Sequence, residues 1–351
     1  MTRRTRSHLP ALARLGALVL LAVLAAACSM MPGAGGAAKP GAASAPPGKL
    51  KVQLNFIRNV EHAGLLFAEK EGYYKEENLE VEIVAGGTGI DPVQVVAAGG
   101  ADVGVSSSSS LINARSQSVP VKSFAAQFQK SPVATTCRAD SGVKQLSDIR
   151  GKKIGVKPTA RPLFNIILTK IGLTADDVEI VPNSQTDITP LADKRIDCLF
   201  TTFAVNEPVA LRQQGVDVLV MLNHDNGLPE QTNAYFASDK TLTEKADLLV
   251  RWTRATQKGW QKALADPSAT AKAVLTSGLV DNLDEKQQAE QARLQTDLMK
   301  SPATTDKGLL WLDSAVWEVN AKNVFEQGVA GRLVAPNEVM TTELLDKARK
   351  S

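Results

Sequence analysis

Apolar and polar residues recur with two distinct periods along most of the chain after residue 50. Residues 79–83 place single glutamates between apolar side chains, which is the period-two pattern of a strand with one buried face. Residues 62–73 carry apolar side chains at helical spacing. Asp91 followed by Pro92 is typical of a helix start, because aspartate caps the first turn and proline is tolerated at its first position. The pattern therefore predicts alternating strands and helices.

The order of these segments predicts sheets with helices on both faces. Strands are predicted at 51–55, 79–83, 101–105, 119–126, 154–156, 178–181, 196–200 and 216–222, and helices at 62–73, 92–99, 111–116, 163–171, from 189 onward and at 208–214. After residue 240 only helices are predicted, at 242–265, 284–300 and 311–327. Two α/β units with a helical tail predict two lobes, whose ligand would lie between them at the carboxyl ends of strands.

The N-terminal segment has the composition of an export signal followed by a tether. Four arginines and no acid flank the apolar run Leu15–Leu24, which is too short to span a bilayer as a helix. Three alanines then precede Cys28, so we predict a lipoprotein signal peptide at 1–27 and a lipid on Cys28. The alternative is ordinary secretory cleavage before an incidental cysteine. Residues 28–49, rich in Ala, Gly, Pro and Ser, predict a flexible tether.

Charge gives no sign of a nucleic-acid partner, and the cysteines and histidines give no sign of a metal. The chain has 40 Lys and Arg against 37 Asp and Glu, and loss of residues 1–27 would remove four arginines and leave a net charge of −1. The three histidines lie far in sequence from Cys137 and Cys198, so we expect no metal site and no cofactor. An oxidising compartment would permit these two cysteines to pair, but we expect two free thiols.

Several motifs follow one another along the body, namely Asn55–Gly64, Ala68–Leu79, Gly86–Gly87, Ala97–Val105, Ser147–Val156 and Asn206–Pro208. As a set they resemble the solute-binding proteins of ABC importers for thiamine pyrimidines, sulfonates, taurine and nitrate. The resemblance covers residues 50–240 well and the helical tail loosely. It implies an α/β, two-lobed periplasmic-binding-protein-like fold (type 2), with mixed sheets, helices on both faces, a hinge of two crossing strands and a helical C-terminal tail.

The same resemblance implies lobe boundaries and partners. Lobe 1 is expected at 50–135 and 236–351 and lobe 2 at 136–235, with crossing strands near Pro132–Arg138 and Thr232–Ser238. The expected partners are a small-molecule solute and the permease and ATPase subunits of an ABC importer. We expect a monomer held by its lipid anchor in the cell envelope, on the outer face of the cytoplasmic membrane or in the periplasm.

The loop after the first predicted strand bears on the identity of the solute. Asn59 with His62–Gly64 is most similar to the branch of the family that binds thiamine-pyrimidine-like heterocycles. Asn55, Phe56 and Arg58 stand where that branch commonly has an acid, a tryptophan and a proline. We therefore predict a small planar nitrogen heterocycle, such as a thiamine pyrimidine precursor. A riboflavin-like heterocycle and a sulfonate, taurine or nitrate stay open as alternatives.

Seven candidate ligand contacts follow predicted strands of the first lobe: Asn55, Phe56, Asn59, His62, Ser106, Ser107 and Ser108. Phe56 is suited to stacking on a flat ring, and the asparagines and the histidine offer hydrogen-bonding groups. Serine hydroxyls and free N–H groups before a helix suit an acceptor such as a carboxylate or sulfonate. The plainer alternatives are core packing for the phenylalanine and capping of turns or helices for the others.

Four further candidates are expected to reach the ligand from the second lobe: Thr159, Arg161, Asn206 and Glu207. An arginine facing the cleft would favour an anionic or carbonyl-bearing solute, and its alternative is a surface position. Glu207 is suited to accept hydrogen bonds from an aminopyrimidine edge, or else it is a first-turn acid favoured by the helix dipole.

We expect a binding protein and not an enzyme, with no catalytic residue. An alternative from another class is a pyrimidine-synthase-like enzyme of the same fold. That branch carries a cysteine-rich cluster for iron and a histidine-rich active site, which two body cysteines and two body histidines do not reproduce. A sensory receptor domain of this fold would need a linked membrane or signalling segment, which we do not expect here.

Overall fold

The structure is a computed structural model that describes residues 46–350 except 88, 185, 186 and 281. The predicted signal peptide, the lipid site Cys28 and most of the predicted tether therefore lie outside the described residues. Residues 44–351 form one compact unit. Among the described residues, no helix is both long enough and apolar enough to cross a membrane.

The first sheet has five strands in the order β2-β1-β3-β10-β4. They are β1 (Gly48–Gln53), β2 (Leu79–Val84), β3 (Val103–Ser106), β4 (Val121–Ala126) and β10 (Ala234–Ser238). β1 runs parallel to β2 and β3, whereas β10 runs antiparallel to β3 and β4. The alternation at 79–83 has the predicted effect, because Leu79 and Ile83 are buried while the glutamates between them are not. β1 begins within the range predicted for the tether.

The second sheet also has five strands, in the order β7-β6-β8-β5-β9. They are β5 (Val133–Arg138), β6 (Lys153–Val156), β7 (Glu179–Pro182), β8 (Cys198–Phe203) and β9 (Val218–Leu222). β6 is parallel to β7 and β8, and β5 is antiparallel to β8 and β9. Both sheets are therefore mixed, as predicted. We call each sheet with its covering helices the first lobe and the second lobe.

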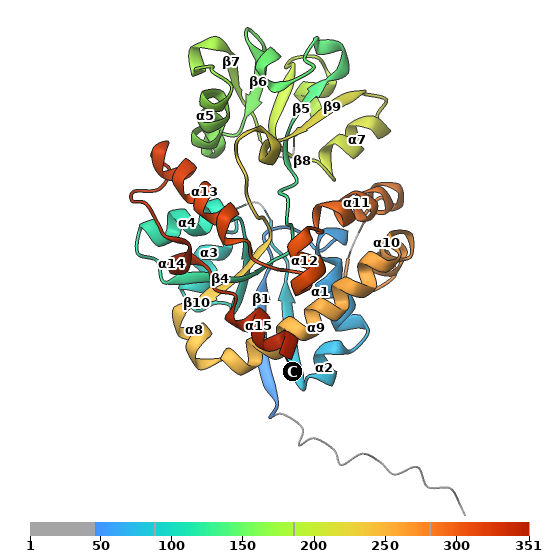
Figure 1. Ribbon diagram of the computed structural model, residues 1–351. Helices are drawn as coiled ribbons and strands as arrows, with labels where there is room; N and C mark the ends of the chain where they lie inside the picture. Colours follow the sequence, from blue (N-terminus) through green and yellow to red (C-terminus); the bar gives the residue numbers. More distant parts are fainter. Residues whose placement is uncertain (1–45, 88, 185–186, 281, 351) are drawn as a thin grey trace, which may run out of the picture. The chain divides into compact units, whose positions relative to one another are not determined.

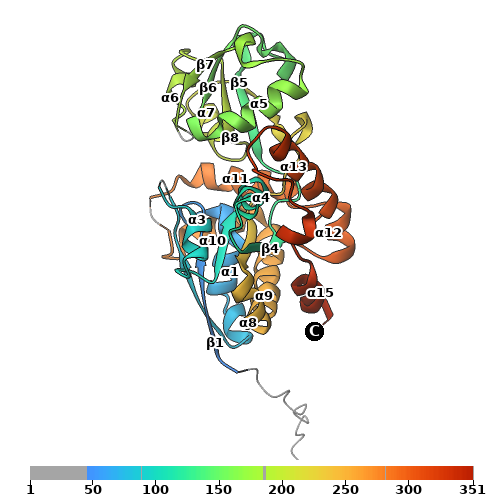
Figure 2. The same cartoon turned by 90° about the vertical axis from the view of Figure 1, so that its left-hand side faces the viewer.

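Helices cover both faces of each sheet (Figures 1 and 2). Those that precede β10 are α1 (Ala63–Lys70), α2 (Tyr73–Glu76), α3 (Pro92–Ala97), α4 (Ser108–Ser116), α5 (Arg161–Lys170), α6 (Thr189–Ala192) and α7 (Glu207–Gln213). Figure 1 shows α3 and α4 to one side of the first sheet and α1 to the other, with α5 and α7 beside the second sheet.

The chain after β10 is helical, as predicted. It forms α8 (Asp239–Glu244), α9 (Ala246–Ala265), α10 (Pro267–Leu275), α11 (Glu285–Leu298), α12 (Pro302–Lys307), α13 (Ser314–Glu326), α14 (Pro336–Val339) and α15 (Glu343–Lys350). α9 packs closely on α1 because both helices have a glycine at the contact: a Cβ on Gly259 would lie 2.0 Å from the Gly64 oxygen. Trp252 and Trp260 of α9 are fully buried in this core.

The chain passes between the two sheets twice, between β4 and β5 and between β9 and β10. The two passages run side by side, since the N–H groups of Gln127 and Phe128 donate to the carbonyls of Asn233 (3.1 Å) and Thr232 (3.2 Å). The predicted hinge of two crossings is therefore present. The ranges predicted for the crossings largely coincide with β5 and β10. These are the first strands after each passage, so the passages themselves lie just before the predicted ranges. The exact lobe boundaries stay a prediction.

Cys137 and Cys198 form a disulfide, so the expected pair of free thiols is wrong. The two residues lie directly opposite each other on the antiparallel neighbours β5 and β8. They are 61 residues apart in sequence, and only the strand order of the sheet makes them adjacent. The sequence pattern predicts the strands but not which strands are neighbours.

Candidate ligand-binding site

A pocket of about 510 Å³ lies between the two lobes. It is lined by Asn55, Phe56, Glu61, Gly87, Gly89, Ile90, Ser106, Ser107, Ser110, Lys157, Ser184, Phe203, Asn206 and Glu207. Several of these residues stand at or just after the carboxyl ends of β1, β3, β6 and β8. The pocket therefore has the position that an open α/β sheet provides for a ligand.

A second pocket of about 290 Å³ adjoins the first and shares Asn55, Ser107, Ser110, Lys157 and Phe203 with it. Its further lining comes from Val133, Thr159, Ala160, Leu163, Phe200, Thr201, Asn223, Leu228, Glu230, Thr232 and Asn233. Many of these residues flank the two passages between the sheets. We call the two hollows the larger pocket and the smaller pocket.

Two buried carboxyl groups face the larger pocket, one from each lobe. Burial raises the pKa of Glu61 to about 7, against the lowering effect of the hydrogen bond from Asn233 and with a further rise from the Glu207 carboxyl. Burial likewise raises the pKa of Glu207 to about 7, against the effect of the Phe203 N–H, which donates to Glu207 Oε2 at 2.7 Å. At neutral pH the pair therefore has both ionised and protonated forms.

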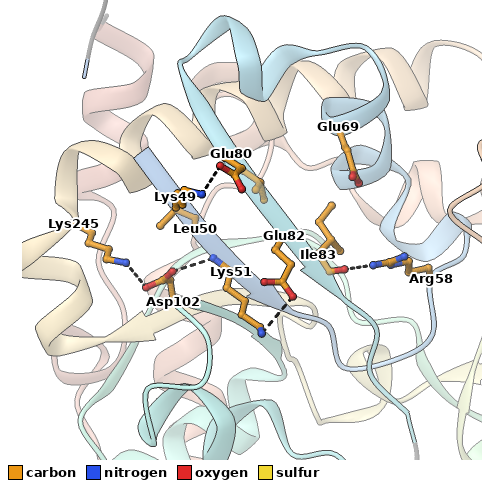
Figure 3. Close-up of a pocket in the computed structure, with 11 residues that line it drawn as sticks. Lys49, Leu50, Lys51, Arg58, Glu69, Glu80, Glu82, Ile83, Asp102 and Lys245 are labelled. Atoms are coloured by element: carbon orange, nitrogen blue, oxygen red, sulfur yellow. Dashed lines mark hydrogen bonds and ion pairs between the residues drawn. The ribbon is translucent and has the colours of Figure 1, made fainter. Parts of the chain in front are cut away.

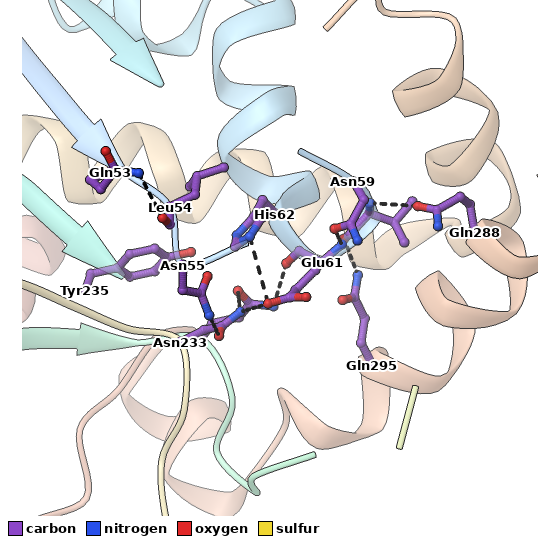
Figure 4. Close-up of polar contacts among 12 residues, drawn as sticks. Gln53, Leu54, Asn55, Asn59, Glu61, His62, Asn233, Tyr235, Gln288 and Gln295 are labelled. Atoms are coloured by element: carbon purple, nitrogen blue, oxygen red, sulfur yellow. Dashed lines mark hydrogen bonds and ion pairs between the residues drawn. The ribbon is translucent and has the colours of Figure 1, made fainter. Parts of the chain in front are cut away.

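The position of Glu61 is fixed by a short turn of 3₁₀ helix, Val60–His62, that leads into α1. Asn59 caps this turn, its Oδ1 accepting from the Glu61 N–H at 2.9 Å. Gln127 of the first passage donates to the Glu61 carbonyl (2.8 Å), and Asn233 of the second donates to Glu61 Oε1 (2.9 Å). Figure 4 shows Asn59 and Asn233 beside Glu61. Both passages between the lobes thus hold Glu61 in place, the first through its main-chain carbonyl and the second through its carboxyl.

Another hollow lies on the outer part of the first lobe, along β1 and β2 (Figure 3). Its charged side chains pair with one another: Lys49 Nζ with Glu80 Oε2 at 2.7 Å, Lys51 Nζ with Glu82 Oε1 at 3.3 Å and Lys245 Nζ with Asp102 Oδ1 at 2.7 Å. Arg58 donates to the Ile83 carbonyl. Because these groups already have partners, we do not take this outer hollow as the candidate site.

Comparisons with known proteins show the family to which this chain belongs. The family profile described as NMT1/THI5 like matches residues 59–270. The chain belongs to the NMT1/THI5-like family. Among curated relatives, the riboflavin-binding protein RibY of Chloroflexus aurantiacus is 26% identical over 93% of this chain and 96% of its own length. The formylaminopyrimidine-binding protein of Halalkalibacterium halodurans is 24% identical over 76% of this chain and 86% of its own length.

Other relatives and structural neighbours include a protein named as an enzyme and one named as a sulphonate-binding protein. A 4-amino-5-hydroxymethyl-2-methylpyrimidine phosphate synthase of Candida albicans is 26% identical over 62% of this chain and 68% of its own length. The periplasmic aliphatic sulphonate-binding protein SsuA of Escherichia coli superposes with a TM-score of 0.65 at 13% identity, over 84% of this chain and 92% of that one. This last likeness supports the two-lobed periplasmic-binding-protein fold of type 2 predicted from the family motifs.

Within this family fold, seven of the eleven predicted contacts line one pocket or the other. Asn55, Phe56, Ser106, Ser107, Asn206 and Glu207 line the larger pocket. Asn55 and Ser107 also line the smaller pocket, where Thr159 joins them. Residues predicted from loops far apart in the sequence are therefore brought together. Their contact with a ligand stays a prediction.

The other four predicted contacts, Asn59, His62, Ser108 and Arg161, line neither pocket. Asn59 caps the turn that carries Glu61, and the Ser108 hydroxyl donates to Asn320 Oδ1 at 3.1 Å. Arg161 is exposed at the start of α5. His62 is fully buried behind Glu61, with Nε2 3.8 Å from Glu61 Oε1, and burial lowers its pKa to about 3. Asn59 and Arg161 thus hold the positions that the plainer alternatives gave them, a turn cap and the protein surface.

Among the pocket residues that sequence reasoning missed are Glu61, Lys157, Phe203 and Asn233. Glu61 lies inside the motif used to recognise the family and immediately precedes His62, so its position was a signal that could have been used. Lys157 directly follows β6, and Phe203 is the last residue of β8. Asking which residue follows each predicted strand would have found Lys157, whereas the strand predicted at 196–200 ends before Phe203. Within the described residues, no group of His, Cys, Asp and Glu is arranged to hold a metal ion.

Proposed function

We propose that this protein is the extracytoplasmic solute-binding component of an ABC importer, and that it captures a small planar nitrogen heterocycle such as a thiamine pyrimidine precursor. The observation that carries the proposal is the larger pocket, which lies between two lobes joined by two passages and is faced by a buried carboxyl from each lobe. Lobes joined in this way can close on a ligand by a hinge motion.

The chemistry of the larger pocket favours a flat solute with N–H donors. Phe56 and Phe203 supply aromatic surface, and Glu61 and Glu207 supply acceptors on opposite walls. An amino-substituted heterocycle would donate to a carboxylate along its edge while its faces contact aromatic rings. The formylaminopyrimidine-binding relative agrees with this solute class.

Two alternatives for the solute differ in how well they fit. A riboflavin-like heterocycle is favoured by the whole-length match to the relative named as riboflavin-binding. A sulfonate, taurine or nitrate is suggested by the sulphonate-binding structures, but these share the fold at 13–15% identity. The ionised forms of the two buried acids on the pocket walls would repel an anion, and the single Lys157 there offsets this only in part, so we rank this alternative last.

We further propose that the protein releases its solute unchanged to the permease and ATPase subunits of the importer. In this proposal it acts as a monomer on the outer side of the membrane, with the lipid on Cys28. Mass spectrometry of the mature N-terminus should find diacylglycerol on this cysteine, and an unmodified thiol would contradict the anchor. The synthase relatives offer an enzyme as the alternative. Recovery of a chemically altered solute after incubation with the purified protein would favour that alternative.

The experiment for the solute class is a thermal-shift panel of formylaminopyrimidine, thiamine, riboflavin, taurine and nitrate. A ligand that binds only the folded state raises apparent stability by about 2.7 kcal/mol at 100 times its dissociation constant. We expect one or more of the planar heterocycles to raise the melting temperature and taurine and nitrate to leave it unchanged. A response to the anions alone would contradict the proposed solute class.

A further inference from the structure

Four residues that line the smaller pocket each carry a buried polar atom that has no hydrogen-bond partner within the described part of the protein. These atoms are Asn55 Oδ1, Thr201 Oγ1, Asn223 Nδ2 and Thr232 Oγ1. Thr201, Asn223 and Thr232 are each more than nine-tenths buried. Buried polar groups are nearly always hydrogen-bonded in folded proteins, so four such atoms around one pocket call for a ligand or water.

The two asparagines among these residues each form a hydrogen bond through the other end of the side-chain amide. Asn223 Oδ1 accepts from the Thr135 hydroxyl at 3.0 Å, and Asn55 Nδ2 donates to Asn233 Oδ1 at 3.0 Å. Both amides are therefore anchored at one end, and the free end remains for the pocket. Each anchored amide leaves one group of fixed type, a donor on Asn223 and an acceptor on Asn55.

Thr201 reaches the pocket through a local irregularity of the second sheet. The pairing of β5 with β8 shifts register between Ala134 and Thr135, and Thr201 falls in the shift. Its φ of +67° is uncommon for a β-branched residue. A bulge of this kind re-aims a side chain, and here the residue concerned has its hydroxyl without a partner.

The types of group in the smaller pocket indicate the chemistry of what fits there. Two threonine hydroxyls both donate and accept, and the anchored amides add one donor and one acceptor. An anion would need donors only, and a cation acceptors only. A chain of hydroxyl groups both donates and accepts along its length, and its carbons would contact the apolar part of the lining, Val133, Leu163 and Leu228.

We propose that the solute consists of a planar ring that occupies the larger pocket and a hydroxylated arm that enters the smaller pocket. This inference rests on the proposed function, whose ring-binding site it extends. The two pockets share five lining residues, Asn55 and Phe203 among them, so a single molecule can span both. The arm supplies the missing partners of Asn55, Thr201, Asn223 and Thr232.

The test compares planar heterocycles with and without a hydroxylated arm. Riboflavin and lumiflavin share one ring system, and only riboflavin has the ribityl chain; cytidine and cytosine form a second pair. Titration calorimetry on the purified wild-type protein gives the affinity ratio within each pair. We expect the armed member of at least one pair to bind about tenfold to a hundredfold more tightly, since several buried hydrogen bonds depend on the arm.

Two variants test which residues carry the difference. Thr201→Val and Thr232→Val keep the branched shape and remove the unpartnered hydroxyl, and Thr243→Val on the exposed face of α8 is the matched control. Each pocket variant should weaken the armed compound several-fold and leave its arm-free counterpart unchanged. The melting temperature without ligand should not fall, because the hydroxyls removed bond to nothing in the described part of the protein. A purely structural role predicts the opposite pattern, a lower melting temperature with unaltered affinities.

The outcomes separate this inference from the proposed function. If the wild-type protein binds the ring compounds and binds their counterparts with a hydroxylated arm equally tightly, the proposed arm is overturned and the proposed function stands. The arm is likewise overturned if the threonine variants leave the affinity ratio unchanged, since ordered water alone then satisfies the pocket. If no member of either pair and no pyrimidine of the thermal-shift panel binds, both the arm and the ring-binding function fail.

Discussion

The outer hollow of the first lobe and the pockets between the lobes use similar residues in different ways. In the outer hollow, three lysines each form an ion pair with a neighbouring acid, and four of these six side chains are more than 40% exposed. Between the lobes, Glu61 and Glu207 are buried with raised pKa values, and four polar atoms lack partners among the described residues. The first arrangement is satisfied within the protein, and we propose that a bound ligand satisfies the second.

A binding site and a merely charged surface differ in whether their polar groups are buried without partners. Exposed ion pairs contribute about 0–1 kcal/mol each, because water screens them. A buried carboxyl or hydroxyl without a full set of partners is costly to the fold, and such a cost is retained where it serves binding. Substitutions in the two regions test this contrast, beginning with the largest expected effect.

Replacing Glu61 by Gln should change how stability depends on pH. The folded carboxyl keeps its proton up to about pH 7, whereas the unfolded one loses it near 4.5. The folded state therefore binds more protons in this window, and the contribution of Glu61 to stability falls as pH rises through it. Glu61→Gln should unfold like wild type at about pH 4 and be more stable by up to about 3 kcal/mol at about pH 8. Urea unfolding of both proteins measures the difference.

Four side chains around the Glu61 carboxyl bear on the difference in stability between Glu61→Gln and wild type. Asn233 and Asn55 donate to its carboxyl, Glu207 faces it across the pocket, and His62 lies behind it. His62 has its pKa lowered to about 3 and is neutral in both proteins above that pH, so it largely cancels. A difference between variant and wild type that stays constant from about pH 4 to about pH 8 would show that Glu61 is an ordinary carboxyl.

Replacing Glu207 by Gln should have the largest effect on affinity. The Phe203 N–H would still find a carbonyl oxygen, but the solute would lose a charged acceptor. Hydrogen bonds to charged groups are worth about 1.5–3 kcal/mol, so an aminopyrimidine should bind about tenfold to a hundredfold more weakly at about pH 8. Glu82→Gln in the outer hollow is the matched control and should bind like wild type. Equal affinities of the two variants, measured by calorimetry, would remove Glu207 from the site.

The sequence predicted local structure well because local structure depends on neighbours in the chain. The alternation at 79–83 and the Asp91 cap of α3 are examples. It failed where distant segments decide the outcome. The pairing of Cys137 with Cys198 depends on β5 lying beside β8. Glu61 is buried because Gln127 and Asn233, from the two passages between the lobes, close over it.

The candidate site shows the same division. Residues at predicted strand ends, such as Phe56 and Ser106, reach the larger pocket because strand direction alone places them there. Asn59 and His62 belong to the same loop, yet both side chains turn into the protein. Family motifs therefore located the loop but could not say which of its side chains face the pocket, since that depends on contacts with α11 and with the passage between β9 and β10.

Replacing Phe56 by Ala should have a moderate effect on affinity. Phe56 is half-buried and lines the larger pocket, and aromatic pairs contribute about 0.5–1.5 kcal/mol beyond burial. We expect a planar heterocycle to bind about threefold to tenfold more weakly. Phe56→Tyr keeps the ring and should retain most of the affinity, which separates stacking from simple filling of space. If alanine and tyrosine bind the solute equally well, the ring of Phe56 does not contact it.

Replacing Lys51 by Ala in the outer hollow should have almost no effect on stability or on solute affinity. Lys51 and Glu82 face each other on the parallel strands β1 and β2, with Lys51 Nζ 3.3 Å from Glu82 Oε1 and the two side chains 42% and 65% exposed. Removal of one partner should lower the free energy of unfolding by less than about 0.5 kcal/mol and leave solute affinity unchanged. Glu82→Gln should behave alike, because a pair screened by water leaves no buried charge behind. Loss of solute binding in Lys51→Ala would mean that the outer hollow, despite the ion pairs along its strands, takes part in recognition.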